Sequence, residues 1–459
     1  MLNQVVIVGR IVNELVLEEN NEGRKYCSMT LTVPRSFKNM DGVYDKDFIK
    51  TTIFGNMAEN TVEYCRVGDI VGVIGKVMLT QTGEPTVKCL EYTHLTKALR
   101  PLPEKFHGLT DKEERYRRRY VDLIMNEEAK RVALTRPKII RAIQEYCDSL
   151  GFVEVETPVL QAIQGGASAR PFITHHNALD RDFYLSIATE LPLKRLIVGG
   201  LEKVYEIGRL FRNEGMDLSH NPEFTTIELY EAYGDLSSMM RITEGMIRFA
   251  AEKVAGKTEF INIFNPESEK IDISQPFKVV TMCDMIKQET GIDFKNNNYS
   301  LVEAIELAKK HGVEVEKHFT TGHIINAFFE KFCEHKLFQP TFSCGHPVEI
   351  SPLTKIDPED NRFVQRFELY IGGHEFANAY TELNDPIDQK NRFLEQLKEK
   401  DAGNDEANDM DVDFVEALEY GMPPCGGVGM GIDRLVMFIT EQVSIREVLL
   451  FPTMKPLSD

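Results

Sequence analysis

The sequence of 459 residues has no long hydrophobic run. No stretch approaches the roughly 18 apolar residues that a membrane helix requires. The apolar residues 5–8 follow no basic segment and are interrupted by Arg10, so we expect neither a membrane span nor a secretory signal. The hydrophobic and charged shares, 42% and 27%, are ordinary for a soluble protein, and we predict a cytoplasmic one.

The eight cysteines include no C-x-x-C pair. In so long a chain, this argues against a structural zinc site and against a disulfide framework. Cys344 and His346 are close in the sequence, but two ligands do not make a metal site. We therefore expect buried free thiols.

The sequence also lacks a phosphate-binding loop motif, an internal repeat and an excess of basic residues. The chain has no G-x-x-x-x-G-K-[ST] loop and no internal repeat. Its 53 basic residues are outnumbered by 72 acidic ones, which gives a net charge of −19. Residues 1–100 carry 12 of each sign, so a surface for nucleic acid is expected in that neutral part of the chain.

Short segments rich in β-branched residues dominate residues 1–100. They are residues 5–8, 26–33, 48–54, 70–77 and 86–92, with one helical segment at residues 57–64. Turn-forming sequences separate them. Five strands with one helix predict a first domain that is a small closed barrel of the oligonucleotide-binding (OB) type.

Residues 101–133 are predicted to form a linker. Pro101 and Pro103 end the barrel, and a helix with four arginines interleaved with tyrosines follows. This helix either meets nucleic-acid phosphates or is a solvated helix between domains. Residues 134–459 lack a regular βαβ alternation, which predicts an α+β domain with an antiparallel sheet flanked by helices and a helical insertion at residues 235–345.

Residues 211–224 place an arginine, a histidine and an aromatic ring around one loop between two predicted strands. Arg212 suits a bridge between a substrate carboxylate and an α-phosphate, His220 a γ-phosphate, and Phe224 the face of a base. The loop therefore indicates activation of a carboxylic acid by ATP. The alternative is an exposed hairpin loop with one core phenylalanine.

Glu368 and Glu375 flank a predicted hairpin turn at residues 372–373. In a two-residue hairpin, Glu368 opposes Ala377 and both carboxylates lie on one face. A hard divalent cation relieves the repulsion between them, and magnesium is the natural choice. The alternative is a pair of solvated acids.

Asn378 and Glu382 have the opposite parity to Glu375 under strict alternation. If they line the same pocket, a bulge near residues 377–379 must re-aim them. Tyr230 and Glu228 lie on the same face of their predicted strand. The candidate carboxylates for a cationic substrate are Glu190, Glu228 and Glu382.

Residues 426–434 form a glycine-rich segment that predicts a strand running into a helix. Glycines let a ligand or another backbone approach closely, and Arg434 offers a planar cation to an adenine ring or a γ-phosphate. A dinucleotide-binding fold is excluded because too little chain remains for its βαβ unit.

Residues 66–459 resemble the class II lysyl-tRNA synthetases. Residues 136–158 are similar to motif 1, 211–230 to motif 2 and 427–434 to motif 3, while 165–172 and 188–191 are the segments that point to lysine. The resemblance implies a homodimer built on motif 1, with magnesium as cofactor. It also implies ATP-dependent activation of lysine to lysyl-adenylate, followed by transfer to tRNA(Lys).

The resemblance implies a role for each matching residue. For ATP, Arg212 lies at the α-phosphate, Glu214 at the adenine amino group and His220 at the γ-phosphate. Phe224 and Arg434 lie on the two faces of the adenine ring. Glu368 and Glu375 are the metal ligands. For lysine they are Gly166 and Glu190 at the α-amino end, Tyr230 and Glu382 at the ε-ammonium, and Glu228 and Asn378 nearby. Because positioning and charge stabilisation carry such chemistry, Arg212 and Arg434 are the expected catalytic residues.

The first 65 residues resemble a different family, the bacterial single-stranded DNA-binding proteins. Residues 1–10 and 48–60 carry this similarity, and the change falls near residues 65–68. By this resemblance, Phe37, Phe48 and Phe54 stack on unpaired bases of a single-stranded nucleic acid. The alternative is that Phe54 and Phe48 belong to the barrel core.

Lysine–tRNA ligase is the leading hypothesis for the function. One alternative is a lysine ligase that acts on a protein acceptor, as in relatives that modify elongation factor P. Another is a catalytically silent protein that binds single-stranded nucleic acid. Charging of tRNA distinguishes a lysine–tRNA ligase from a ligase with a protein acceptor. Activation of lysine distinguishes both ligases from a catalytically silent binding protein.

Overall fold

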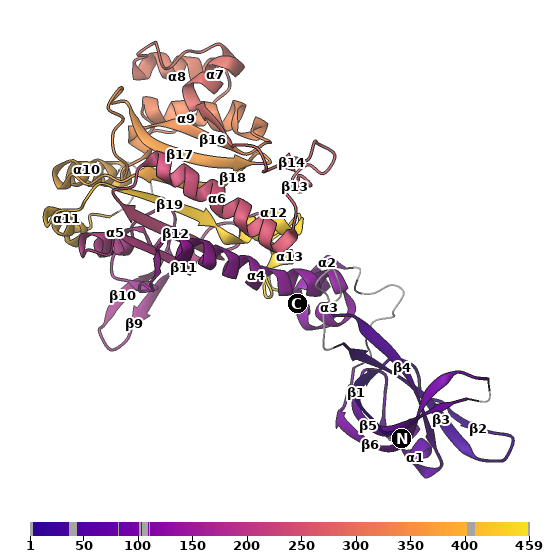
Figure 1. Ribbon diagram of the computed structural model, residues 1–459. Helices are drawn as coiled ribbons and strands as arrows, with labels where there is room; N and C mark the ends of the chain where they lie inside the picture. The colour runs from indigo at the N-terminus through magenta and orange to yellow at the C-terminus, as the bar shows by residue number, and fades with distance from the viewer. Residues whose placement is uncertain are drawn as a thin grey trace. The chain divides into compact units, whose positions relative to one another are not determined.

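The computed structural model describes residues 3–35, 44–80, 82–100, 102, 109, 111–401 and 409–457. The chain divides into two compact units, Met1–Arg131 and Val132–Asp459, each shown in Figure 1. Within the described ranges, no helix is both long and apolar enough to cross a membrane.

The first unit is a closed barrel. Its strands are β1 (Val5–Ile11), β2 (Leu17–Glu19), β3 (Lys25–Pro34), β4 (Lys46–Phe54), β5 (Ile70–Leu79) and β6 (Pro85–Thr96), with one helix, α1 (Asn56–Tyr64). The order β1-β5-β6-β4-β3-β2 closes through an additional β1–β3 pairing. The five predicted strands and the helix are confirmed, and the short strand β2 was not predicted.

Alternation along the strands explains the barrel. In β3, Cys27, Met29 and Leu31 are buried, and the residues between them face outward, as expected of a half-buried strand. Gly55 takes a positive φ of 67° at the start of α1, a conformation that favours glycine. The helix then buries Ala58 against the barrel core.

The predicted basic helix is two short helices, α2 (Lys112–Arg117) and α3 (Arg119–Met125). Arg119 is almost fully buried, and its Nη1 lies 2.6 Å from Asp122 Oδ2. Arg115 Nε donates to the same carboxylate at 2.9 Å. These pairings favour a structural role for both arginines over contact with nucleic-acid phosphates.

The second unit is built on an eight-stranded sheet with the order β15-β16-β17-β18-β19-β12-β11-β7. The strands are β7 (Val153–Glu154), β11 (Lys203–Phe211), β12 (Glu223–Ala232), β15 (Lys278–Thr281), β16 (Thr341–Pro347), β17 (Phe363–Ile371), β18 (His374–Thr381) and β19 (Cys425–Gly431). The six central strands are antiparallel, as predicted. The edge strands β7 and β15 instead pair in parallel, and long crossovers of the kind that parallel pairs need precede their partners.

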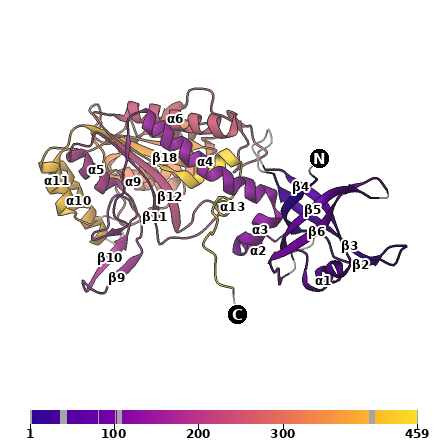
Figure 2. The same cartoon turned by 60° about the horizontal axis from the view of Figure 1, so that its bottom comes forward.

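One face of this sheet is covered by helices. Figure 2 shows α4 (Glu127–Ser149) and α6 (Leu236–Ala255) lying over it, and α12 (Ile432–Thr440) joins them in a continuous core. Ile139, Met246 and Leu435 come from these helices, and Leu229 and Leu369 from the sheet. All five are buried, so this face is closed and a ligand must use the other one.

Smaller elements surround the open face. At one end, α5 (Glu190–Val198) and α11 (Val412–Glu419) share a hydrophobic cluster with Phe393 of α10 (Pro386–Asp401). A second cluster holds α7 (Met282–Thr290), α8 (Leu301–Lys310) and α9 (Thr321–Phe332) together. The remaining pieces are β8 (Leu160–Gln161), β9 (Ile173–His176), β10 (Arg181–Leu185), β13 (Glu259–Phe260), β14 (Ile271–Asp272), η1 (Glu334–Lys336), η2 (Val348–Ile350) and α13 (Ile445–Val448).

Candidate active site

A cavity of about 480 Å³ lies on the open face of the sheet, over the central strands. It gathers residues that are far apart in the sequence. The predicted site residues that line it are Gly166, Glu190, Arg212, Glu214, His220, Phe224, Glu228, Tyr230, Glu368, Glu375, Asn378 and Arg434. Glu382 does not line it; this residue is fully buried behind the wall.

The hairpin β17–β18 differs from its predicted register in one respect. Tyr370 faces Glu375 as predicted, but Glu368 faces Asn378 and not Ala377. The register shifts by one residue between these pairs, which makes Phe376 the extra residue of a bulge. The predicted bulge is confirmed one residue earlier than expected, and it brings Glu375 and Asn378 to the same cavity.

Glu368 is held by two neighbours on its own strand. Its carboxylate accepts hydrogen bonds from Arg366 Nη2 at 2.7 Å and from the Tyr370 hydroxyl at 2.6 Å. Burial acts to raise its pKa, but the charges of His346 and Arg366 offset that effect, and the pKa is lowered overall. Glu368 is therefore an ionised, oriented carboxylate.

Glu375 is the opposite case. Its side chain is exposed, and within the described residues its carboxylate accepts no hydrogen bond. Partial loss of hydration and the charge of Glu368 raise its pKa, and because the side chain is exposed, repulsion from Glu368 is the stronger of the two effects. Two carboxylates that repel across a cavity fit a hard cation with oxygen ligands.

At the other end of the cavity, Lys194 lies between two carboxylates. Its Nζ is 2.5 Å from Glu190 Oε1 and forms an ion pair with Glu382, with all three side chains buried. The Tyr380 hydroxyl donates to the second oxygen of Glu190 at 2.5 Å. Burial alone would lower the pKa of Lys194, but the charges of Glu190 and Glu382 raise it overall, so the ammonium is charged.

Glu228 completes this buried acidic group. Its carboxylate accepts from the Thr189 amide at 3.1 Å and from the Tyr230 hydroxyl at 3.3 Å. Loss of hydration, and next the charge of Glu190, raise the pKa of Glu228 to about 7. Glu190 and Glu382 thus share the Lys194 ammonium, Glu228 has no ion pair in the described part of the chain, and a cationic ligand would complete the charge balance.

Binding of lysine alone should tighten as the pH rises through 7. Below this pKa Glu228 is neutral, and above it the ionised carboxylate attracts a cationic ligand. We expect the dissociation constant measured by calorimetry to fall about tenfold between pH 6 and pH 8. Glu228→Gln should bind more weakly with no such dependence; an unchanged slope in that variant would contradict the assignment.

At the phosphate end, Arg212 has its guanidinium 5.2 Å from the Phe224 ring centroid. Its buried Nε has no hydrogen-bond partner, and no ion pair involves it in the described part of the chain. Arg434 donates to the Glu375 carbonyl, and its Nη2 lies 3.4 Å from His220 Nε2. The cavity therefore offers cations to an anionic ligand here.

Two glycines let the lysine end of the cavity form. Gly166 has a positive φ of 90°, and a Cβ there would lie 3.4 Å from Glu190 Cβ. Gly427 in β19 lies beneath two side chains, because a Cβ there would overlap Glu382 Oε1 and the Tyr230 ring. Only a residue without a side chain allows Glu382 and Tyr230 to lie where they do.

Gly427→Ala should damage lysine binding selectively. Overpacking of this kind costs about 1–3 kcal/mol, so we expect the KM for lysine to rise about 10- to 100-fold while the KM for ATP changes little. Gly429→Ala on the same strand is the matched control, since its Cβ would lie 3.5 Å from Glu228 Cγ, an ordinary contact. Equal effects of the two substitutions would show that Gly427 has no special steric role.

The barrel presents two of its three predicted aromatic residues. Phe48 is 56% exposed and Phe54 is half-buried, and neither belongs to the barrel core. Phe54 pairs with Tyr26 across β3 and β4, and the Arg24 guanidinium lies 5.0 Å from its ring centroid. Phe37 lies outside the described residues.

Several residues in and around the cavity were missed at the level of sequence. Arg366 and Tyr380 line it, Lys194 and Tyr370 contact its carboxylates, and the charge of Glu334 interacts with those of Glu368 and Glu375. A signal for most of them was available: Lys194 stands four residues after Glu190 on a helix, and Arg366 and Tyr370 alternate with Glu368 on one strand face. Glu334 carried no such signal; loss of hydration, and then the charge of Glu330, raise its pKa to about 7.

Comparison with known proteins agrees with this geometry. Residues 111–455 match the tRNA synthetases class II (D, K and N), so the chain belongs to that class of synthetase. Proteins named lysine–tRNA ligase from Onion yellows phytoplasma and Enterococcus faecalis are 57% and 58% identical over 89% of this chain, and over 79% and 81% of their own lengths. A lysine–tRNA ligase from Bacillus subtilis is 59% identical over 85% of this chain and 77% of its own length.

These relatives place the chain in the lysine–tRNA ligase family, and it is an aminoacyl-tRNA ligase. Residues 2–89 also match the single-strand binding protein family. Because the ligase alignments leave only about one tenth of the chain uncovered, the two resemblances overlap within the barrel. Both predicted resemblances are therefore confirmed.

Proposed function

We propose that the cavity activates L-lysine with ATP and that the lysyl group is then transferred to tRNA(Lys). In the first step, a lysine carboxylate oxygen attacks the α-phosphorus of ATP. The bond from that phosphorus to the bridging oxygen breaks, and pyrophosphate leaves. In the second step, a terminal ribose hydroxyl of the tRNA attacks the lysyl carbonyl and AMP leaves.

The charge balance at the buried end of the cavity is the observation that favours lysine over other amino acids as the substrate. Glu190 and Glu382 share the ammonium of Lys194, whereas the neighbouring Glu228 accepts hydrogen bonds from the Thr189 amide and the Tyr230 hydroxyl and has no ion pair among the described residues. A substrate with two ammonium groups supplies the missing positive charge, whereas a neutral or acidic amino acid leaves buried carboxylates unpaired. Gly166 and Glu190 would receive the α-amino end, and Tyr230 and Glu382, assisted by Asn378, the ε-ammonium.

Arg212 and Arg434 would act on the nucleotide. The unpaired guanidinium of Arg212 suits the charge that develops on the α-phosphate, and Phe224 offers a face to adenine with Arg434 opposite. Glu214 would read the adenine amino group, and His220 would meet the γ-phosphate. These residues position and stabilise; no protein nucleophile is needed.

Glu368 and Glu375 would hold magnesium. Both offer carboxylate oxygens, the ligands that this ion prefers, and Glu375 has an unengaged carboxylate. The ion would neutralise phosphate charge when bound. Arg366 and Tyr370 keep Glu368 ionised and oriented for that task.

The tRNA would be bound partly by the barrel. Phe48 and Phe54 lie on an outer surface that also carries Arg24 and Lys88, whose Nζ is 5.9 Å from the Phe54 ring centroid. An exposed ring and a half-buried ring with cations beside it suit unpaired bases, such as those of an anticodon loop or of single-stranded nucleic acid. A homodimer built on motif 1 belongs to the same proposal.

The decisive experiment is amino-acid-dependent exchange of pyrophosphate into ATP, followed by tRNA charging. Lysine should support exchange, while arginine, aspartate and asparagine should not. Purified tRNA(Lys) should then accept the lysyl group, and substitution of its anticodon should weaken charging without affecting exchange. Exchange with another amino acid would refute the lysine assignment, and exchange without charging would favour a protein acceptor.

A further inference from the structure

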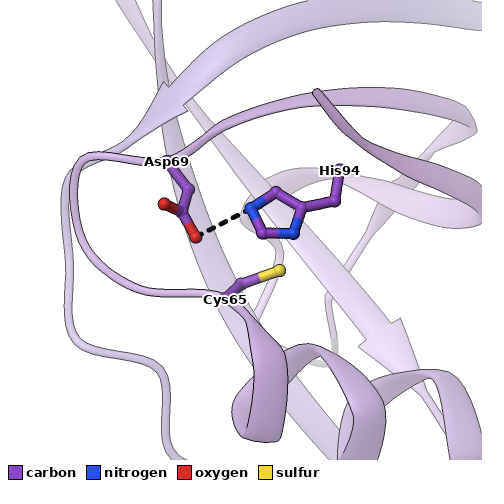
Figure 3. A group of neighbouring side chains, drawn as sticks. All are labelled: Cys65, Asp69 and His94. Atoms are coloured by element: carbon purple, nitrogen blue, oxygen red, sulfur yellow. Dashed lines mark ion pairs between the residues drawn. The ribbon is translucent and has the colours of Figure 1, made fainter. Parts of the chain in front are cut away.

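Three side chains of different chemistry converge in the first unit, and none of them lines the cavity. They are Cys65, Asp69 and His94, shown in Figure 3. Each offers one ligand atom, and the three atoms lie within 4.8 Å of one another. Cys65 ends α1, Asp69 immediately precedes β5, and His94 lies in β6, so three separate segments meet here.

Two atoms of this cluster already form an ion pair. His94 Nε2 is 3.0 Å from Asp69 Oδ2, although this contact lacks the geometry of a hydrogen bond. The Cys65 side chain is only 2% exposed, and its sulfur makes no hydrogen bond in the described part of the chain. A buried thiol without a hydrogen bond therefore lies beside a His–Asp ion pair, which brings three potential metal ligands together.

Asp69 is already held in place. Its Oδ2 accepts from the Arg66 amide at 2.8 Å, and its Oδ1 accepts from the Ala98 amide. A ligand carboxylate oriented by backbone amides is the kind of support that metal sites use.

We propose that Cys65, Asp69 and His94 form a binding site for Zn²⁺. A thiolate, a carboxylate and an imidazole are all zinc ligands, and bond lengths of about 2.0–2.3 Å put the ligand atoms of a tetrahedral site about 3.3–3.6 Å apart. The His94–Asp69 pair, at 3.0 Å, opens by a few tenths of an ångström, and the other distances, within 4.8 Å, close by roughly 1 Å. The Cys65 proton goes to solvent on binding. His94 is 21% exposed, so water can fill the fourth position.

Such a site fastens the end of α1 to β6. It also extends past the part of the barrel that matches the single-strand binding family, since that match ends at residue 89 and His94 lies beyond it. The site is independent of the active-site cavity, because all three ligands belong to the first unit. It therefore does not rest on the proposed ligase reaction.

The test uses the full chain after removal of metal by a chelator. We expect one equivalent of Co²⁺ to give thiolate-to-cobalt charge-transfer absorption, and Zn²⁺ to displace it. Cys65→Ser should abolish that absorption, and His94→Gln should weaken zinc binding, measured against a chromophoric chelator, by at least about tenfold. Magnesium sites in the cavity do not interfere, since only a thiolate ligand gives this absorption.

Cys89→Ser is the matched control. Cys89 is a buried barrel cysteine whose thiol donates to the Glu91 carbonyl at 3.3 Å, and it should keep full cobalt absorption. In each variant, lysine-dependent exchange of pyrophosphate into ATP shows whether the second unit is folded, and circular dichroism shows whether the barrel is folded.

Two results would overturn the proposal: no charge-transfer absorption in the unaltered protein, or the same absorption in Cys65→Ser. If Cys65→Ser fails to fold, His94→Gln decides the question, because this partly exposed side chain leaves the barrel core intact. Zinc affinity equal to that of the unaltered protein in His94→Gln would then overturn it.

Discussion

Arg212→Ala should lower kcat for lysine-dependent exchange of pyrophosphate into ATP by about 10³-fold. The guanidinium has no ion pair in the described part of the chain and lines the cavity. Its charge is therefore available to an α-phosphate whose negative charge grows in the transition state. A group that acts mainly there lowers kcat more than it raises KM.

A neighbouring arginine provides the control. Arg209 lies three residues earlier on β11, is exposed, and pairs with Glu223 outside the cavity. Arg209→Ala should change kcat by less than about twofold, as expected for a surface ion pair. Arg212→Lys should recover part of the lost rate, because the charge remains but the planar fork is gone. A similar loss in both alanine variants would point to damage to the strand and remove Arg212 from the reaction.

Lys194→Met should lower the free energy of unfolding of the second unit by about 3–5 kcal/mol. Lys194 is fully buried and contacts both Glu190 and Glu382. Methionine fills most of the same space but leaves two buried carboxylates without their cation. The loss should be read from hydrogen exchange in β18 and β19, because bulk unfolding signals mix the two units.

Two further variants separate charge from packing. Lys253 also lies on a helix and pairs with Glu145, but it is 42% exposed, so Lys253→Met should cost less than about 1 kcal/mol. In the double variant Lys194→Met, Glu382→Gln, one uncompensated charge is gone, and stability should partly return. If Lys194→Met were as mild as Lys253→Met, the buried group would not depend on this ammonium.

Local patterns were sufficient to predict most elements. The five barrel strands, the hairpin at residues 372–373 and the strand-to-helix passage at residues 426–434 follow from alternation and turn-forming residues, which depend on near neighbours in the chain. Glu190 was expected at the start of a helix and begins α5. The antiparallel centre of the sheet was predicted, but its two parallel edges were not.

The candidate site divides in the same way. Identities such as Arg212, Glu368 and Arg434 could be read from motifs, because the residue types and their spacing already specify the chemistry. The strand register of Glu368 could not be read from the sequence, because the bulge at Phe376 depends on how two strands pack in the whole sheet. Strict alternation therefore placed Ala377 where the structure has Asn378.

The sequence by itself determined the class of protein, the barrel and most of the candidate site residues, although Arg366 and Tyr380 were missed and Glu382 does not line the cavity. Only the tertiary structure decided which charges meet: Glu190 and Lys194 with Glu382, and Cys65 and Asp69 with His94. Both groups join residues that are distant along the chain. Their energies come from burial and from distances of a few ångströms, quantities that exist only once the chain has folded.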